Sequence, residues 1–311
     1  MQATTFTFQS HDKQAEIFCH KWSPEADMPI RQVFLIVHGM AEHAARYARL
    51  AERLTEQGFV VYAHDQRGHG KTARQGEDIG YFADDNGWLR VVQDITTLTE
   101  IAQKEHPKLP VILFGHSMGS FLVQFVLFEH SHRFAGAVLS AAVDSVGPLR
   151  LIGMVATRVE RYRLGRRGRS KVLNAMSFGD FNKPFRPNRT DFDWLSRDEA
   201  EVDAYVADEK CGFIITTQMW LDCLEGFGEI ARADLRARIR KDLPVYLVGG
   251  EKDPVTRMGE GMKGLAQAYA QAGLTDISLH LYPDGRHEIF NEINRKHVTD
   301  DLVHWLLRVT E

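Results

Sequence analysis

The stretch Val111-Ile-Leu-Phe-Gly-His-Ser-Met-Gly119 is the most informative part of the chain, and an apolar helix-like segment follows it directly as far as Phe128. A buried strand that turns sharply into a helix through Gly-x-Ser-x-Gly is typical of a nucleophile elbow, with the serine exposed at the turn. Serine is a weak nucleophile unless a base lies beside it. Ser117 is therefore the candidate nucleophile, and the alternative is a glycine-rich turn without chemistry.

Apolar runs of strand length alternate with helix-like segments on both sides of this stretch. The predicted strands are 33–37, 59–63, 111–114, 135–140, 245–248 and 277–281, and the predicted helices are about 47–57, 88–104, 118–128, 261–271 and 291–309. This alternation predicts an α/β protein with a mostly parallel sheet flanked by helices. Two earlier runs, Thr4–Gln9 and Ala15–Trp22, predict a hairpin.

Residues 144–235 carry no strand signal and are interrupted by glycine and proline, as at Gly165 and Pro184. We therefore expect residues 1–143 and 236–311 to form one core domain and residues 144–235, called the cap segment below, to be an inserted helical cap. Within it, Ser196-Arg-Asp-Glu199 predicts a helix start with Ser196 as the N-cap of a capping box.

Ser117 needs an acid and a histidine as partners. In proteins with this type of elbow the acid comes after the serine in the chain and the histidine comes after the acid. Asp253 comes shortly after the strand 245–248 and directly before a proline. His287 follows the strand 277–281 after a short loop that contains a glycine. Both positions lie at the carboxyl edge of the expected sheet. The alternatives left open are Glu251 for the acid and His280 or His297 for the base.

An acyl-transfer site also needs N–H donors for the oxyanion of the tetrahedral intermediate. The strand 33–37 ends in His38-Gly-Met40, where glycine permits a close backbone approach. The amide groups of Met40 and Met118 are the candidate donors, and the alternative is a simple turn after the strand.

The cap segment is rich in aromatic residues, which suits an apolar acyl-binding tunnel. We take Phe178, Trp194 and Trp220 as candidate substrate-binding residues. The alternative, compatible with the first, is that these rings pack the cap onto the core. The other rings considered are Phe181, Phe185, Phe192, Phe213 and Phe227.

Apolar residues at helical spacing between Leu149 and Tyr162 lead into a strongly basic stretch. The apolar positions are Leu151, Val155 and Val159, and the basic ones are Arg158, Arg161, Arg163, Arg166, Arg167, Arg169 and Lys171. A basic amphipathic helix predicts peripheral contact with an anionic membrane surface. The alternative is a solvated charged face whose apolar side packs on the body.

Composition excludes several other classes of function. The chain has 311 residues and a formal charge of −4 (38 Lys and Arg against 42 Asp and Glu), so we expect no nucleic-acid partner. The three cysteines, Cys19, Cys211 and Cys223, do not form a disulfide framework. No secretion signal is recognisable, and we expect a cytoplasmic protein, at most peripheral to the inner membrane surface.

No cofactor is expected. Gly68-His-Gly-Lys-Thr72 lacks the first glycine of a phosphate-binding loop. Four early histidines, His38, His43, His64 and His69, lack metal-ligand spacing and are interpreted as structural residues under the elbow, so we also expect no metal.

Several motifs together resemble the α/β-hydrolase fold, most closely its monoacylglycerol lipase and lysophospholipase branch. They are His38-Gly-Met-Ala-Glu-His43 with Arg46-Tyr47, Ala63-His-Asp-Gln-Arg-Gly-His-Gly70, Gly115-His-Ser-Met-Gly119, and Leu195 to Asp203 continuing to Asp208 and Cys211. The resemblance implies Ser117, Asp253 and His287 as the triad and Met40 and Met118 as oxyanion donors. Ser120 departs from it, because the family often has a second glycine there.

The resemblance implies a serine hydrolase that cleaves carboxylic esters of lipid-like substrates, such as monoacylglycerols or lysophospholipids, through an acyl-enzyme. Three alternatives remain open: a thioesterase, a proline-releasing aminopeptidase, and a non-catalytic ligand- or membrane-binding protein. The aminopeptidase needs acidic residues of the cap near the site, for which Glu225 and Glu229 are the candidates.

Overall fold

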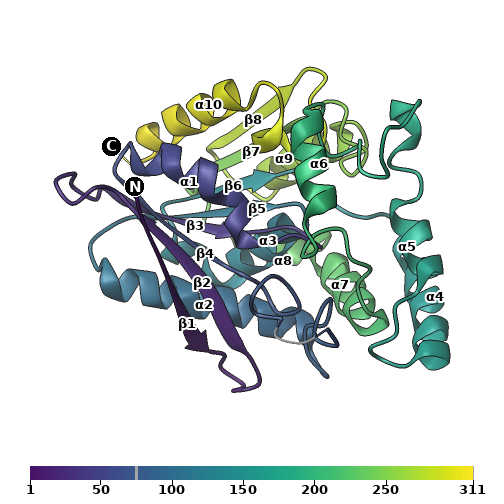
Figure 1. Ribbon diagram of the computed structural model, residues 1–311. Coiled ribbons are helices and arrows are strands. Elements are labelled where there is room, and N and C mark those ends of the chain that lie inside the picture. The colour runs from purple at the N-terminus through teal and green to yellow at the C-terminus, as the bar shows by residue number, and fades with distance from the viewer. Residues whose placement is uncertain (74–75, 311) are drawn as a thin grey trace.

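The computed structural model describes residues 1–73 and 76–310, and within them the sheet has the strand order β1-β2-β4-β3-β5-β6-β7-β8 (Figure 1). The strands are β1 (Gln2–Gln9), β2 (Glu16–Ser23), β3 (Gln32–Val37), β4 (Phe59–His64), β5 (Val111–His116), β6 (Gly136–Ser140), β7 (Val245–Gly250) and β8 (Ile277–Tyr282). The β1–β2 and β2–β4 pairs are antiparallel, and every other pair is parallel. This confirms the predicted hairpin and mostly parallel sheet.

Helices cover both faces of the sheet (Figure 1). Buried residues of α1 (Ala48–Thr55) and α10 (Arg295–Arg308) pack on one face. Those of α2 (Gly87–Glu105), α3 (Met118–His130) and α9 (Glu260–Gln271) pack on the other. Strands β3 to β7 are buried along their whole length, which explains why their sequences are continuous apolar runs rather than alternating ones.

The cap segment lies between β6 and β7 in the chain, at the right of Figure 1. Its helices are α4 (Leu149–Leu164), α5 (Lys171–Phe178), α6 (Glu199–Ala207), α7 (Thr217–Ile230) and α8 (Ala233–Arg236), with a 3-10 turn at Lys183–Phe185. Helix α7 packs against α2 and α3. The contact with α2 is close, because a Cβ on Gly226 of α7 would lie 2.2 Å from the ring of Trp88 in α2. The division of the chain into core and cap stays a prediction.

Two local predictions are wrong. Helix α6 begins at Glu199 with Asp198, not Ser196, as its N-cap, and the Asp198 carboxylate accepts from the Ala200 amide at 3.1 Å. The Ser196 hydroxyl instead donates to the Asn291 carbonyl at 2.9 Å. The last helix begins at Arg295 rather than near 291, because residues 289–291 form a 3-10 turn.

Candidate active site

Ser117 lies in a sharp turn between β5 and α3, with a backbone φ of 52° and ψ of −122°. The two flanking glycines are required by close backbone contacts. A Cβ at Gly119 would lie 2.1 Å from the Val37 carbonyl oxygen, and one at Gly115 would lie 2.4 Å from the Gly119 carbonyl oxygen. A positive φ in a non-glycine residue is strained, and such strain is typical of functional sites. This is the geometry that the sequence predicts for a nucleophile elbow.

Ser120 fits into the elbow through its hydroxyl. The Ser120 side chain is buried and donates to the Ser117 carbonyl at 2.7 Å. On the other side of the turn, the Ser117 amide donates to the Ser140 carbonyl of β6 at 2.9 Å. The departure from the family pattern is therefore accommodated by a local hydrogen bond.

His287 and Asp253 come together from the loops after β8 and β7. His287 Nδ1 lies 3.0 Å from Asp253 Oδ1, and both side chains are buried. Burial alone disfavours the charged imidazole, but the Asp253 carboxylate outweighs it and raises the pKa of His287. The rival bases His280 and His297 lie instead 3.5 Å from Asp301.

The elbow and this histidine are neighbours. The ring of His116, the residue before Ser117, lies 4.8 Å from the His287 ring between centroids. Within residues 1–73 and 76–310, Ser117 Oγ has no hydrogen bond to His287. Nucleophile–base hydrogen bonds are often long without substrate and shorten in the complex, so this arrangement fits the pair of roles.

The loop after β3 lies against the elbow. A Cβ on Gly39 would lie 3.3 Å from Ser117 Cβ and 2.8 Å from Glu42 Oε1. The Glu42 carboxylate accepts from the Gly39 amide at 2.6 Å and from the Tyr47 hydroxyl at 2.8 Å. Over the described residues the amides of Met40 and Met118 donate no hydrogen bond, so both candidate oxyanion donors keep their N–H groups free.

Arg46 links this loop to the histidine loop. Its guanidinium donates to Glu42 at 2.7 Å and binds both carboxylate oxygens of Glu288 at 2.7 Å each. Burial opposes ionisation of the two carboxylates, but the Arg46 charge outweighs it and lowers the pKa of Glu42 and of Glu288. The sequence does not predict this network: Arg46 stands in the quoted motif and Glu288 directly after His287, but nothing near either residue indicates the other.

Two of the four early histidines, His38 and His69, are buried and accept hydrogen bonds from backbone amides, one of them in the oxyanion loop. His69 Nε2 accepts from the Ala41 amide at 3.2 Å, and His38 Nε2 accepts from the Gln66 amide at 3.0 Å. Burial lowers the pKa of His69 to about 4, which keeps its ring neutral and able to accept. His43 does not join them, since its Nε2 lies 2.8 Å from the Asp208 carboxylate.

Aromatic rings of the cap segment reach the histidine. The Trp194 ring lies 5.0 Å from that of His287, and the Phe178 ring lies 6.3 Å from Trp194 and 5.8 Å from Trp220. The three candidate substrate-binding rings thus form a continuous apolar row that begins at His287. Phe227 packs on Trp88 and Phe121 in the core instead.

Comparisons with known proteins place the chain in a family. The family described as "Serine aminopeptidase, S33" matches residues 28–294. The monoacylglycerol lipase of Mycolicibacterium smegmatis is 31% identical over 92% of this chain and 91% of its own, and the monoglyceride lipase of Mus musculus is 27% identical over 93% and 84%. A thermostable carboxyl esterase from Bacillus coagulans, solved in complex with glycerol, superposes over 100% of both chains with a TM-score of 0.91 and 25% identity.

The sheet and the elbow at its centre define an α/β-hydrolase. Within that class, the chain belongs to the family described as serine aminopeptidase S33, and its relatives include monoacylglycerol lipases. The resemblance stated from the sequence is confirmed by the family match and by the monoacylglycerol lipase and esterase among the similar proteins.

Proposed function

We propose that this protein is a serine hydrolase that cleaves monoacylglycerols or closely related single-chain lipid esters. The observation that carries the proposal is the buried His287–Asp253 pair, 3.0 Å apart, beside the strained turn of Ser117. An imidazole held by a buried carboxylate next to an exposed hydroxyl is the arrangement that activates serine in unrelated hydrolases.

In the proposed reaction, Ser117 Oγ attacks the ester carbonyl carbon while His287 Nε2 accepts the hydroxyl proton. The Asp253 carboxylate holds Nδ1–H and stabilises the imidazolium. The carbonyl oxygen becomes an oxyanion that accepts from the Met40 and Met118 amides. The C–O bond to the alcohol then breaks, and His287 returns the proton to the departing alcohol oxygen.

An acyl group then remains bonded to Ser117. Water attacks this ester, with His287 accepting a water proton and returning it to Ser117 Oγ. The products are a fatty acid and the free alcohol, and the enzyme is regenerated without a cofactor.

The aromatic row supports an apolar acyl chain as the group to be bound. Trp194 contacts the His287 ring, Phe178 contacts Trp194, and Trp220 contacts Phe178, so three parts of the cap segment contribute to one row of rings. Apolar walls with few polar groups bind an extended hydrocarbon chain through the area that they remove from water. The names of the relatives, two of them monoacylglycerol lipases, agree with such a substrate.

The family description makes an aminopeptidase the second candidate. A peptidase of this kind needs an acidic side chain near the site to hold the substrate ammonium group. Glu225 is exposed on α7, and Glu229 pairs with Arg232 at 2.8 Å on the surface. Neither candidate acid is therefore a free carboxylate in the aromatic row, which favours the ester substrate.

The test is to label the purified protein with a fluorophosphonate and to measure hydrolysis of monoacylglycerols, lysophospholipids, thioesters and proline-containing dipeptides. We expect labelling and monoacylglycerol hydrolysis, and loss of both in Ser117→Ala with an unchanged circular dichroism spectrum. Full activity in Ser117→Ala would overturn the mechanism. Preference for a dipeptide would overturn the substrate class.

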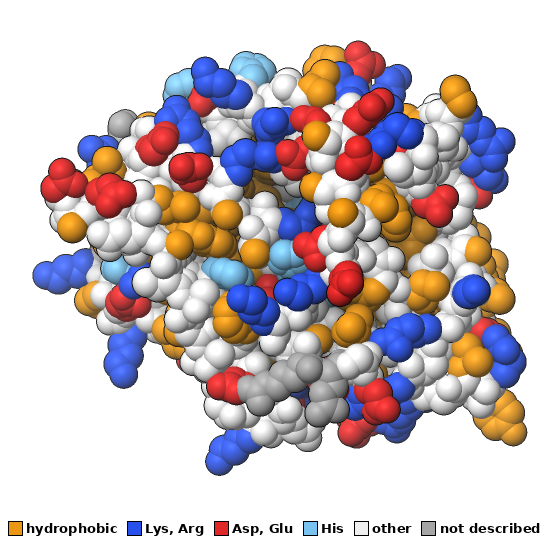
Figure 2. All heavy atoms as spheres, in the orientation of Figure 1, with side chains coloured by type: hydrophobic (Ala, Val, Ile, Leu, Met, Phe, Trp, Pro, Cys, Tyr) orange, Lys and Arg blue, Asp and Glu red, His pale blue; other side chains and the backbone are white. Residues whose placement is uncertain are grey.

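We further propose that the enzyme contacts lipid surfaces through α4. No helix of residues 1–73 and 76–310 is long and apolar enough to span a bilayer. Helix α4, however, exposes a row of apolar side chains at the right edge of Figure 2. The exposed fractions are 71% for Leu149, 60% for Leu151, 58% for Ile152, 61% for Val155, 59% for Val159 and 95% for Tyr162.

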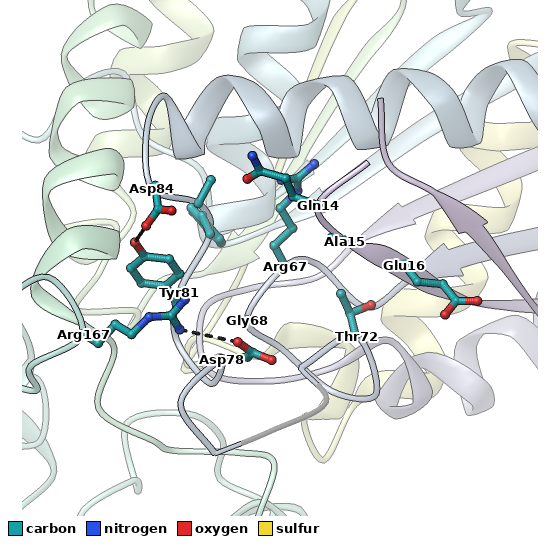
Figure 3. Close-up of a pocket in the computed structure, with 12 residues that line it drawn as sticks. Gln14, Ala15, Glu16, Arg67, Gly68, Thr72, Asp78, Tyr81, Asp84 and Arg167 are labelled. Atoms are coloured by element: carbon teal, nitrogen blue, oxygen red, sulfur yellow. Dashed lines mark hydrogen bonds and ion pairs between the residues drawn. The ribbon is translucent and has the colours of Figure 1, made fainter. Parts of the chain in front are cut away.

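Three arginines of the basic stretch that follows α4 contact the loop before α2. The Arg167 guanidinium stacks over the Tyr81 ring at 4.0 Å and pairs with Asp78 at 3.4 Å, at the rim of a cavity of about 190 Å³ (Figure 3). Arg166 and Arg169 donate to backbone carbonyls of residues 76–84. These three side chains hold the cap segment to the loop before α2, so the apolar row is the stronger candidate for the contact.

Flotation with anionic vesicles tests the contact. The double variant Ile152→Ser with Val155→Ser should bind vesicles less, while hydrolysis of a short water-soluble ester stays unchanged. Leu279→Ser, which alters an exposed leucine on β8, is the matched control. Equal vesicle binding by all three proteins would overturn the α4 contact and leave the ester hydrolase untouched.

A further inference from the structure

Three side chains of metal-ligand type meet beside the oxyanion loop. Their ligand atoms, one each from His43, Asp208 and Cys211, all lie within 4.8 Å of one another. His43 Nε2 and Asp208 Oδ2 are already 2.8 Å apart. His43 precedes the 3-10 turn that leads into α1, whereas Asp208 and Cys211 follow α6 in the cap segment. No other such group of three occurs in residues 1–73 and 76–310.

We propose that His43, Asp208 and Cys211 form a binding site for Zn²⁺ or a similar borderline-soft divalent cation. Imidazole nitrogen, carboxylate oxygen and thiolate sulfur are all zinc ligands, with bonds of about 2.0–2.3 Å. Around a tetrahedral ion of that bond length, neighbouring ligand atoms stand roughly 3.3–3.6 Å apart. The cluster therefore needs only side-chain adjustments of about an ångström to enclose an ion.

The backbone around the cluster is held in place without the ion. The Gly212 amide and the Tyr205 hydroxyl both donate to the Ala41 carbonyl at 2.9 Å. The Cys211 amide donates to the Asp208 carbonyl at 2.9 Å. The ligands therefore start from fixed positions, which lowers the conformational cost of binding.

An ion can reach the cluster from solvent. The His43 side chain is 12% exposed and that of Asp208 is 36% exposed. A water molecule on that open side supplies the fourth ligand that a three-residue zinc site requires.

The surrounding charges favour a cation. The negative groups that act on the cluster are Glu42, Glu288 and Asp208, and the positive ones are Arg46 and Lys210, so one negative charge is in excess. The cation binds the Cys211 sulfur as a thiolate, so binding releases the thiol proton.

This site differs from the metal cluster that the sequence analysis considered and rejected. That one comprised four early histidines, of which only His43 takes part here. Asp208 is 165 residues away from His43 in the chain. A bound ion would cross-link the cap segment to the loop that carries Met40, in addition to the hydrogen bonds on the Ala41 carbonyl.

The test is a titration of the metal-free protein with Zn²⁺ in competition with a chromophoric chelator, together with the Co²⁺ absorption spectrum. We expect one tight site per chain and a Co²⁺–thiolate charge-transfer band. Cys211→Ser should remove the band, and both Cys211→Ser and His43→Gln should weaken Zn²⁺ binding by at least about tenfold. Zn²⁺ should also raise the melting temperature of the wild type and not that of Cys211→Ser.

His297→Gln is the matched control, because His280 and His297 around Asp301 are another place where a surface ion can bind. This variant should keep the tight site and the thiolate band. Loss of tight binding in His297→Gln, unchanged binding in Cys211→Ser, or no tight binding by the wild type would each overturn the proposal.

Discussion

The Arg46 guanidinium binds both oxygens of Glu288 at 2.7 Å, and Glu288 is the residue after His287 in the chain. The same guanidinium donates to Glu42, which holds the Gly39 amide. One cation therefore fixes the loop that carries Met40 relative to the loop that carries the histidine. Arg46 is a positioning residue, because it acts on the reaction through these two loops.

Replacing Arg46 by alanine should destabilise the fold and lower kcat. The side chains of Arg46, Glu42 and Glu288 are 12%, 4% and 7% exposed, so the variant leaves two nearly buried carboxylates without their cation. Breaking a buried pair in this way costs about 3–5 kcal/mol of unfolding free energy, measurable by urea denaturation. Arg46→Lys should restore part of the lost unfolding free energy, since lysine keeps the positive charge but cannot make the two-point contact with the carboxylate.

Arg53→Ala is the control for this loss. Arg53 is 40% exposed and pairs with Glu56 and Asp300, so its removal should cost no more than about 1 kcal/mol. The positioning role is wrong if Arg46→Ala and Arg53→Ala have equal stability and equal kcat.

Asp253→Asn should move the acid limb of the kcat/KM profile to lower pH. In the wild type the Asp253 carboxylate outweighs burial and raises the pKa of His287, so activity falls as the pH drops through that raised value and the base becomes protonated. Without the Asp253 carboxylate the pKa of His287 falls. The plateau should also drop by roughly 10⁴-fold, because the imidazolium is no longer stabilised.

The matched control for this profile is Asp301→Asn. Asp301 lies 3.5 Å from His280 and from His297, away from His287. Its variant should keep both the plateau and the acid limb of the wild type. An acid limb that stays in place in Asp253→Asn would mean that another group governs the profile.

Gly119→Ala should abolish activity and reduce stability, because its Cβ would lie 2.1 Å from the Val37 carbonyl oxygen and 2.6 Å from that of His38. Gly153→Ala is the control within α4, where the added Cβ would meet Leu224 at an ordinary 3.5 Å. That variant should gain up to about 1 kcal/mol from helix propensity. Melting temperatures of the two variants test the contrast, and similar values would contradict it.

The sequence predicts what depends on short stretches of chain. Strands β3 to β7 are buried on both faces and are continuous apolar runs, so their existence and parallel arrangement are legible. The elbow can be predicted because Gly115, Ser117 and Gly119 are close in sequence. Asp253 and His287 can be chosen from the predicted strands, because each residue comes shortly after the end of a predicted strand.

The sequence does not predict what depends on distant partners. Arg46 and Glu288 are 242 residues apart, and nothing local to either shows the other. Helical spacing marks the apolar face of α4 but does not tell whether another element covers it, and most of that face is exposed. Ser196 and Asp198 are both good N-caps, and the sequence does not show that Ser196 bonds the distant Asn291 carbonyl while Asp198 caps the helix.

The stability of the protein should fall between mildly acidic and mildly alkaline pH because of Asp222. This side chain is buried, its Oδ1 accepts from Gln218 at 3.0 Å, and over the described residues its Oδ2 has no hydrogen-bond partner. Burial raises the pKa of Asp222 from 3.8 to about 7. A carboxyl whose pKa is raised on folding contributes stability that is fully present below about pH 4 and is lost as the pH rises through about 7.

Asp222→Asn should therefore be more stable than the wild type at pH 8 and similar to it at pH 4. The difference in unfolding free energy at pH 8 is on the order of 4 kcal/mol, since the pKa rises from 3.8 to about 7 and each unit corresponds to roughly 1.4 kcal/mol. Urea denaturation at the two pH values measures it. Asp242→Asn, at a carboxylate whose side chain is 75% exposed, should change neither value, and an Asp222→Asn protein with the pH dependence of the wild type would show that another group is responsible.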